Sequence, residues 1–218
     1  MSVSTDLQRP MVVVIDDDAD VREALKGLFR SVGLAVNAFG SVSEFQDADL
    51  PERPGCMVLD VRLPGKSGLE FQEELVRAKS RRPIVFISGH ADIAMCARAM
   101  KAGAVEFLAK PVRDQDLLDA VHTAIDRDLR QRAGEDERAR RRADVARLSV
   151  REQEVMAQVV AGRRNKQIAG DLGVSEGTVK LHRAQIMRKL QVQTLADLVR
   201  IADGLGDVAG ISIDRPRI

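Results

Sequence analysis

The sequence of 218 residues contains no tryptophan, no tyrosine and only two cysteines. Cys56 and Cys96 stand inside apolar stretches, without the spacing of a metal site or a disulfide framework, so we expect both to be core thiols in a reducing compartment. No apolar run approaches the roughly 20 residues needed to cross a bilayer, and residues 1–10 lack the pattern of a signal peptide. We therefore expect a cytoplasmic protein that does not enter a membrane.

The few aromatic residues and the charges are unevenly distributed along the chain. All six phenylalanines lie in the first half, at positions 29, 39, 45, 71, 86 and 107. Residues 1–127 contain 16 Lys and Arg against 20 Asp and Glu, whereas residues 128–218 contain 18 against 13. An acidic half with an aromatic core, followed by a basic half without one, predicts two domains with different partners. The basic half is the candidate for nucleic-acid binding.

The acidic half alternates short apolar runs with helical patterns. The apolar runs cover residues 11–15, 34–39, 56–60, 83–87 and 105–108. Apolar residues recur at helical spacing between and after these runs, and glycines or capping boxes such as residues 41–44 mark helix ends. Five βα units of this length predict an α/β doubly wound five-stranded parallel sheet.

Polar residues with complementary chemistry stand where these predicted strands end. They are Asp16 and Asp17 after the first strand, Asp60 at the end of the third, Ser88 after the fourth and Lys110 after the fifth. Parallel strands place these ends at one edge of the sheet. Carboxylates about 4 Å apart repel by roughly 4 kcal/mol per pair at an effective dielectric of 20, which a bound Mg²⁺ would relieve. The cation, the lysine and the serine would each bind one oxygen of an incoming phosphoryl group. Asp60, central in the cluster, is then the carboxylate left to attack the phosphorus.

Each of these residues also has a purely structural explanation. The acidic run and the serine can cap helices, and the lysine can be a solvated side chain. Residues 16, 18 and 20 have the spacing of a calcium loop, but Val21 stands at the glycine position and Gly27 at that of the final glutamate. The joint pattern at four strand ends favours a phosphoryl-acceptor site.

Residues 11–127 resemble a response-regulator receiver domain, which has the CheY-like fold. The matching motifs are VIDDD at 14–18, LDVRLPG at 59–65, ISGH at 87–90 and FLAKP at 107–111. The resemblance implies that a sensor histidine kinase phosphorylates Asp60. It also implies that Asp17, Asp60 and the backbone carbonyl of Arg62 bind Mg²⁺, with Asp16 helping through water.

The same resemblance implies two further features of the receiver domain. The peptide bond between Lys110 and Pro111 is expected to be cis. Ser88 and Phe107 are expected to form a switch, in which the hydroxyl moves towards the phosphoryl group and the ring turns inward behind it. The sequence departs from the family at Asp18, where glutamate is commoner.

A densely charged segment, residues 127–147, follows the receiver. Acid-before-base pairs at i,i+4 recur here, each worth about 0.2–0.5 kcal/mol in a helix, and they predict a solvated helix that continues the fifth helix. A flexible charged tether remains an alternative. A coiled coil is disfavoured because only alanines occupy the middle of the segment.

The basic half begins with a capping box at residues 149–152 and contains four helical patterns. Two of them are joined by a tight turn at Gly173 and Ser175, which predicts a helix-turn-helix in a small four-helix domain. The second helix of this pair buries one face and turns a small or polar face outward. Its predicted base-reading residues are Thr178, Lys180, Leu181, Ala184, Gln185 and Arg188. The predicted phosphate contacts are Arg163, Arg164, Lys166 and Lys189.

A structural four-helix bundle with ordinary surface charge would also fit this pattern. However, residues 147–203 resemble a LuxR-type DNA-binding domain, most closely as it occurs in the NarL/FixJ subfamily. The matching stretches are LSVREQEV at 148–155, NKQIA at 165–169 and VSEGTVKLHRAQIMRKL at 174–190. The resemblance implies a dimer on a two-half-site promoter, with the last helix in the dimer contact.

These observations together predict a phosphorylation-controlled transcription regulator rather than an enzyme. Residues 1–126 would be the receiver, 127–147 the linker, 148–204 the DNA-binding domain and 205–218 a loose tail. Phosphorylation would favour a homodimer that binds double-stranded promoter DNA and works with RNA polymerase as an activator.

Two other classes of protein remain open at this point. A phosphatase of the haloacid dehalogenase type would use Asp16 as nucleophile and leave Asp60 without a role. A receiver that acts as a phosphate-independent docking module would leave DNA binding unregulated by Asp60.

Overall fold

The computed structural model describes residues 9–90 and 92–205. The chain divides into two compact units between Ala133 and Gly134. Within the described ranges, no helix combines the length and the apolar character that crossing a bilayer requires.

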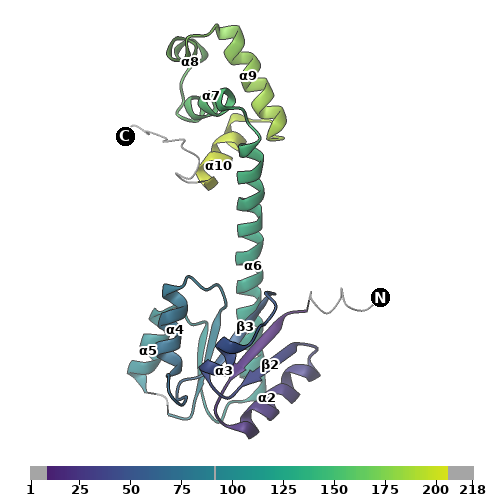
Figure 1. The fold of residues 1–218 in the computed structure, drawn as a ribbon, viewed down its shortest axis with the longest axis vertical. Helices are drawn as coiled ribbons and strands as arrows, with labels where there is room; N and C mark the ends of the chain where they lie inside the picture. Colours follow the sequence, from purple (N-terminus) through teal and green to yellow (C-terminus); the bar gives the residue numbers. More distant parts are fainter. Residues whose placement is uncertain (1–8, 91, 206–218) are drawn as a thin grey trace. The chain divides into compact units, whose positions relative to one another are not determined.

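The first unit is built on a parallel sheet flanked by helices (Figure 1). The strand order is β2-β1-β3-β4-β5. Its strands are β1 (Met11–Ile15), β2 (Ala35–Phe39), β3 (Gly55–Asp60), β4 (Ile84–Ser88) and β5 (Glu106–Ala109). Its helices are α2 (Ala19–Ser31), α3 (Val42–Asp47), α4 (Gly68–Arg77), α5 (Ile93–Lys101) and the first part of α6 (Asp114–Ala146). The predicted doubly wound five-stranded sheet is confirmed.

The central strands are apolar on both faces because helices cover both sides of the sheet. On one face, Val12 and Val14 pack with Phe29 of α2 and Leu117 of α6. On the other, alternate residues of β1 and β3 form a second core with Phe71 of α4 and with α5. All five residues of β1 are fully buried, so the sheet fixes where the chain emerges at the carboxyl end of this strand.

Helix α6 includes the charged segment predicted as a linker, and it is helical through Gly134. Two of its expected acid–base pairs are formed: Arg132 Nε lies 2.8 Å from Asp128 Oδ2, and Arg141 contacts Glu137. Asp128 also contacts the receiver sheet, and the first compact unit extends to Ala133.

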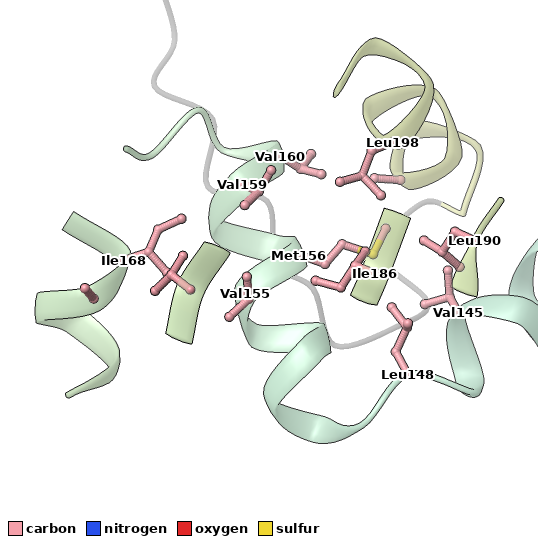
Figure 2. Packing of buried hydrophobic residues seen from close by; sticks show 13 residues of the cluster. Val145, Leu148, Val155, Met156, Val159, Val160, Ile168, Ile186, Leu190 and Leu198 are labelled. Carbon is pink, nitrogen blue, oxygen red and sulfur yellow. The ribbon is translucent and has the colours of Figure 1, made fainter. Parts of the chain in front are cut away.

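The second unit consists of the end of α6 with α7 (Val150–Val160), α8 (Asn165–Leu172), α9 (Glu176–Lys189) and α10 (Leu195–Leu205). Ser149 caps α7 in a capping box with Glu152, as predicted. Figure 2 shows the shared core, in which Met156, Ile186 and Leu198 come from three different helices. The small all-α domain is confirmed, and the predicted loose tail lies outside the described residues from position 206 on.

Candidate functional site

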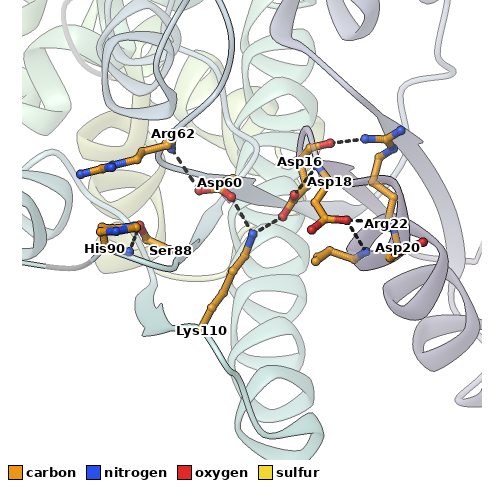
Figure 3. Close-up of polar contacts among 10 residues, drawn as sticks. Asp16, Asp18, Asp20, Arg22, Asp60, Arg62, Ser88, His90 and Lys110 are labelled. Atoms are coloured by element: carbon orange, nitrogen blue, oxygen red, sulfur yellow. Dashed lines mark hydrogen bonds and ion pairs between the residues drawn. The ribbon is translucent and has the colours of Figure 1, made fainter.

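The strand register brings the predicted site residues to one edge of the receiver sheet. Ile15 pairs with Leu59, so Asp16 and Asp60 follow side by side on neighbouring strands. Asp60 pairs with Ile87, and Ser88 with Ala109, which places Ser88 and Lys110 on the same edge (Figure 3). Residues from four strands therefore meet where the sequence predicted.

Lys110 connects two of the acids directly. Its Nζ lies 2.6 Å from Oδ2 of Asp16 and 2.6 Å from Oδ2 of Asp60 (Figure 3). Burial lowers the pKa of Lys110, but hydrogen bonds to the two carboxylates outweigh this effect and raise it above its ordinary value. The Lys110 N–H donates to the backbone carbonyl of Ser88 at 2.8 Å, and the peptide bond to Pro111 is cis, as the resemblance implied.

Asp16 is completely buried and held from several sides. Its Oδ1 accepts the backbone N–H of Asp18 at 3.0 Å, and its backbone carbonyl accepts Nη1 of Arg22 at 2.6 Å. Burial raises the pKa of Asp16, and the hydrogen bonds from Lys110 and from the Asp18 N–H oppose this rise only in part. The sequence did not single out Arg22, whose position in the first turns of the following helix was the available signal.

Asp17 is exposed, but it belongs to the same acidic pocket. Carboxylate oxygens of Asp16, Asp17 and Asp60 all lie within 4.8 Å of one another. Hard oxygen donors at this spacing fit a divalent cation such as Mg²⁺, which binds through a few carboxylates, water and phosphate. Asp18 is a helix cap, the structural explanation that the sequence offered for it: its side chain caps α2 by accepting the N–H groups of Asp20 and Val21.

The backbone around Asp60 is tightly fixed. Its Oδ1 accepts the N–H of Arg62 at 3.0 Å, which orients the carboxylate towards the pocket. The residue is only 6% exposed, so its carboxylate is largely shielded from solvent. Gly68, the first residue of α4, donates its N–H to the carbonyl of Val61 at 3.0 Å and packs on the Asp60 backbone.

Ser88 and Phe107 occupy neighbouring strands. Ser88 is fully buried, and its Oγ accepts the N–H of His90 at 3.3 Å. It does not cap α5, because Asp92 does so by accepting the Met95 N–H. The Phe107 ring is half-buried, and its centroid lies 5.9 Å from that of Phe86.

In the second unit, the helix-turn-helix consists of α8, a turn and α9. Gly173 ends α8 in the left-handed region at φ 65°, and Ser175 caps α9 by accepting the Thr178 N–H at 3.1 Å. Val179 and Ile186 point into the core, so the opposite face of α9 is turned to solvent. The residues predicted to read bases are exposed or half-buried on that face: Thr178, Lys180, Leu181, Ala184, Gln185 and Arg188.

The four residues predicted to contact DNA phosphates have different partners and exposure in the structure. Arg164 and Lys166 are exposed near the start of α8. Arg163 is paired with Asp171 at 3.1 Å. Lys189 donates to the buried carboxylate of Glu152 at 2.7 Å, so it links α9 to α7 within the domain.

Two contacts that position α9 were missed by the sequence reasoning. Glu152 was expected only as part of a capping box, yet it also anchors Lys189. Arg183 donates to Oδ1 of Asn165 at 2.8 Å and joins the two helices of the helix-turn-helix. Neither partner is near in sequence, so no local spacing pointed to these pairs.

Comparisons with known proteins find a matching family model for each of the two units. A family model described as the response regulator receiver domain matches residues 12–122. The chain belongs to the response regulators. A second model, for the luxR family of bacterial regulatory proteins, matches residues 146–202 of this response regulator.

Several relatives match over nearly their whole length. Nodulation protein W of Bradyrhizobium diazoefficiens is 50% identical over 198 residues, covering 91% of this chain and 87% of that protein. The transcriptional regulatory protein FixJ of Azorhizobium caulinodans is 43% identical over 191 residues, covering 88% and 90%. The solved structure of the response regulator StyR matches with a TM-score of 0.78 and 46% identity, covering 89% of this chain and 98% of that one.

This response regulator therefore combines a receiver domain with a LuxR-type DNA-binding domain. It is a phosphorylation-controlled transcription regulator from a family that is not enzymatic. The receiver implies a phosphodonor kinase, and its acidic pocket is typical of Mg²⁺ binding.

Proposed function

We propose that Asp60 accepts a phosphoryl group from a sensor histidine kinase, and that this modification controls promoter binding by α9. One observation carries the proposal above the others. The Lys110 ammonium is hydrogen-bonded to both Asp16 and Asp60 at the open edge of the sheet, so positive charge lies beside the carboxylate that would receive a phosphoryl group.

The acidic pocket would hold the cation through Asp16, Asp17, Asp60 and the backbone carbonyl of Arg62. When bound, Mg²⁺ would neutralise negative charge on the pocket and on the incoming phosphoryl oxygens. Backbone donors orient the two carboxylates: the Arg62 N–H fixes that of Asp60, and the Asp18 N–H fixes that of Asp16.

In the transfer, an Asp60 carboxylate oxygen forms the new bond to phosphorus as the bond between phosphorus and the kinase histidine nitrogen breaks. The histidine nitrogen leaves with the electron pair of that bond. Lys110 then faces a phosphoryl group in place of the free carboxylate, so its ammonium can pair with a phosphoryl oxygen without leaving Asp16. The kinase provides the phosphoryl group, and this chain provides the acceptor and its electrostatic setting.

Ser88 and Phe107 would transmit the modification. The Ser88 Oγ accepts the His90 N–H at 3.3 Å, and its own O–H would donate to a phosphoryl oxygen on Asp60. The half-buried Phe107 ring, beside Phe86, could then turn towards the space behind the serine. This movement would alter the surface around β5, which we propose as part of the homodimer contact.

The DNA-binding domain would place α9 in the major groove. Lys180, Gln185 and Arg188 would read base edges together with Thr178, Leu181 and Ala184. Arg163, Arg164 and Lys166 would contact phosphates, while Lys189, which is paired with Glu152, would chiefly hold α9 to α7. We further propose that the phosphorylated homodimer binds two half-sites and recruits RNA polymerase as an activator, in the cytoplasm where its DNA lies.

Mapping the phosphoryl group tests this proposal. The full chain would be treated with acetyl phosphate and Mg²⁺, reduced with borohydride and digested, and the modified aspartate located by mass spectrometry. We expect modification of Asp60, its loss in Asp60→Asn, and its retention in Asp49→Asn, which changes an exposed acid outside the pocket. Modification of Asp16 instead would support the phosphatase alternative and contradict the proposal.

A further inference from the structure

A hollow of about 310 Å³ lies at the edge of the receiver sheet opposite the acidic pocket. It is formed where the loop before β4 meets α6 and the loop before β3. Its lining residues are Glu52, Lys79, Ser80, Arg81, Arg82 and Arg132, and we call it the basic hollow. Four of these side chains are cationic and one is anionic, so the local potential favours an anion.

The loop that follows α4 places several donors on the rim of the basic hollow. Lys79 lies in the left-handed region at φ 54°, and the Ser80 N–H donates to the backbone carbonyl of Leu75 at 2.8 Å. This turn ends α4 and leaves Lys79, Ser80 and Arg81 exposed in succession. An ammonium, a hydroxyl and a guanidinium group therefore follow one another along one side of the hollow.

Arg82 contributes a donor from deeper in the wall. Its Nη1 is buried and has no hydrogen-bond partner among the described residues. Burial lowers the pKa of Arg82, while the charge of Asp128 opposes this and that of Arg132 adds to it. A buried guanidinium nitrogen without an acceptor is costly. Arg82 also lines the basic hollow, where an anion would accept hydrogen bonds from its guanidinium group.

Asp128, whose charge acts on Arg82, already accepts hydrogen bonds from other groups. Asp128 Oδ2 accepts the Gly55 N–H at 2.9 Å and Arg132 Nε at 2.8 Å. Its Oδ1 is buried and also lacks a partner within the described ranges, so Asp128 attracts Arg82 without forming a hydrogen bond to it. Arg132 in turn is held beside the hollow by this carboxylate and by Glu52, 3.6 Å away.

We propose that the basic hollow binds a phosphate group, held by Arg82, Arg132 and Lys79 with the Ser80 hydroxyl. A phosphate offers enough acceptor oxygens and charge to engage two guanidinium groups and an ammonium at once, which a single carboxylate does not. The hollow has room for a phosphate together with the group that carries it. That group belongs either to a small phosphate-bearing compound or to a DNA backbone.

The test is a titration of the full chain with inorganic phosphate, followed by amide NMR. Chloride would balance the ionic strength, and EDTA would keep the acidic pocket free of divalent cations. We expect saturable shifts at residues 79–82 and 55. In Arg82→Gln the phosphate affinity should fall about ten-fold, because one charge-assisted donor is lost.

Two further variants guard against misfolding and general charge effects. Lys79→Asn tolerates the left-handed backbone and removes a rim charge, so it should weaken phosphate binding several-fold. Arg113→Gln changes an arginine whose side chain is 86% exposed elsewhere on the same unit, and it should leave the affinity unchanged. Shifts that do not saturate, or that are equal in Arg82→Gln and wild type, would overturn the proposal. Either result would mean that the Arg82 charge interacts with Asp128 and not with a phosphate.

Duplex DNA distinguishes the two sources of phosphate. If the backbone of DNA occupies the basic hollow, Arg82→Gln should weaken binding of the full chain to DNA and reduce its salt slope by about 1. If a small phosphate-bearing molecule occupies it, DNA affinity should be the same in both proteins while the affinity for inorganic phosphate still falls.

Discussion

Gly68 packs against the backbone of Asp60 so closely that a Cβ at position 68 would lie 2.2 Å from the Asp60 carbonyl oxygen. The first residue of α4 and the candidate phosphoacceptor therefore fix each other's position. A side chain at position 68 can be accommodated only if α4 or the end of β3 moves, because the contact is with backbone.

We expect Gly68→Ala to lower the free energy of unfolding of the receiver by about 1–3 kcal/mol and to reduce labelling of Asp60 by acetyl phosphate. Gly27→Ala is the control, since open space surrounds position 27 in α2 and alanine favours a helix. Hydrogen exchange in β3 reports the stability. Unchanged exchange and labelling in Gly68→Ala would show that the backbone contact is unimportant.

Asp128 is expected to stabilise the receiver although it lies in the segment predicted as a linker. Its carboxylate is buried, accepts the first N–H of β3 and pairs with Arg132. Asp128→Ala should destabilise the receiver by about 2–4 kcal/mol, because a buried donor and a half-buried arginine lose their partner. Asp126→Ala, an exposed acid on the same helix, should change little. Equal effects of the two substitutions on hydrogen exchange at Gly55 would contradict this role.

Arg188 and Lys189 are adjacent in sequence but should behave differently. Arg188 is exposed on the outward face of α9, so Arg188→Gln should weaken DNA binding and relax its sequence preference. Lys189 is paired with Glu152, so Lys189→Gln should chiefly reduce the stability of the domain, by about 1–2 kcal/mol because the lysine is partly exposed. The measurements are DNA titrations at several salt concentrations and hydrogen exchange in α7. A larger loss of DNA affinity in Lys189→Gln would reverse the assignment.

The Glu152 pair should make the DNA-binding domain sensitive to acid. The hydrogen bond from Lys189 is the main cause that lowers the pKa of Glu152 below its ordinary 4.5, and burial opposes it. The stability it contributes is therefore present above pH 4.5 and is lost as the pH falls through the lower, folded-state pKa. Glu152→Gln should destabilise the domain at neutral pH and less so in acid, measured by hydrogen exchange in α7. A penalty that does not depend on pH would exclude this linkage.

The arrangement of the acidic pocket could be predicted from sequence because parallel strands end together. Asp16, Asp60, Ser88 and Lys110 each follow an apolar run, and no knowledge of side-chain contacts was needed to bring them to one edge. The caps at Asp18 and Ser149 were equally visible, since capping depends on neighbours within a few residues.

Long-range partners could not be predicted in this way. Lys189 was assigned to DNA phosphate because nothing near it in sequence suggests Glu152, which lies on another helix. Asp128 was assigned to a solvated linker because its pairing with Arg132 has ordinary helical spacing, whereas its contact with Gly55 depends on how α6 packs on the sheet. In both cases tertiary packing, and not local pattern, decided which partner a charged side chain has.

The most direct test of the whole account is the affinity of the full chain for a promoter fragment, selected from genomic DNA with the phosphorylated protein. The affinity would be measured with and without acetyl phosphate and Mg²⁺, in wild type and in Asp60→Asn. We expect the phosphodonor to raise the affinity of wild type about ten-fold or more, a coupling within the usual range for such switches, and to leave Asp60→Asn unchanged. Equal affinity of wild type with and without the phosphodonor, despite confirmed labelling of Asp60, would contradict control by phosphorylation and support a docking role for the receiver.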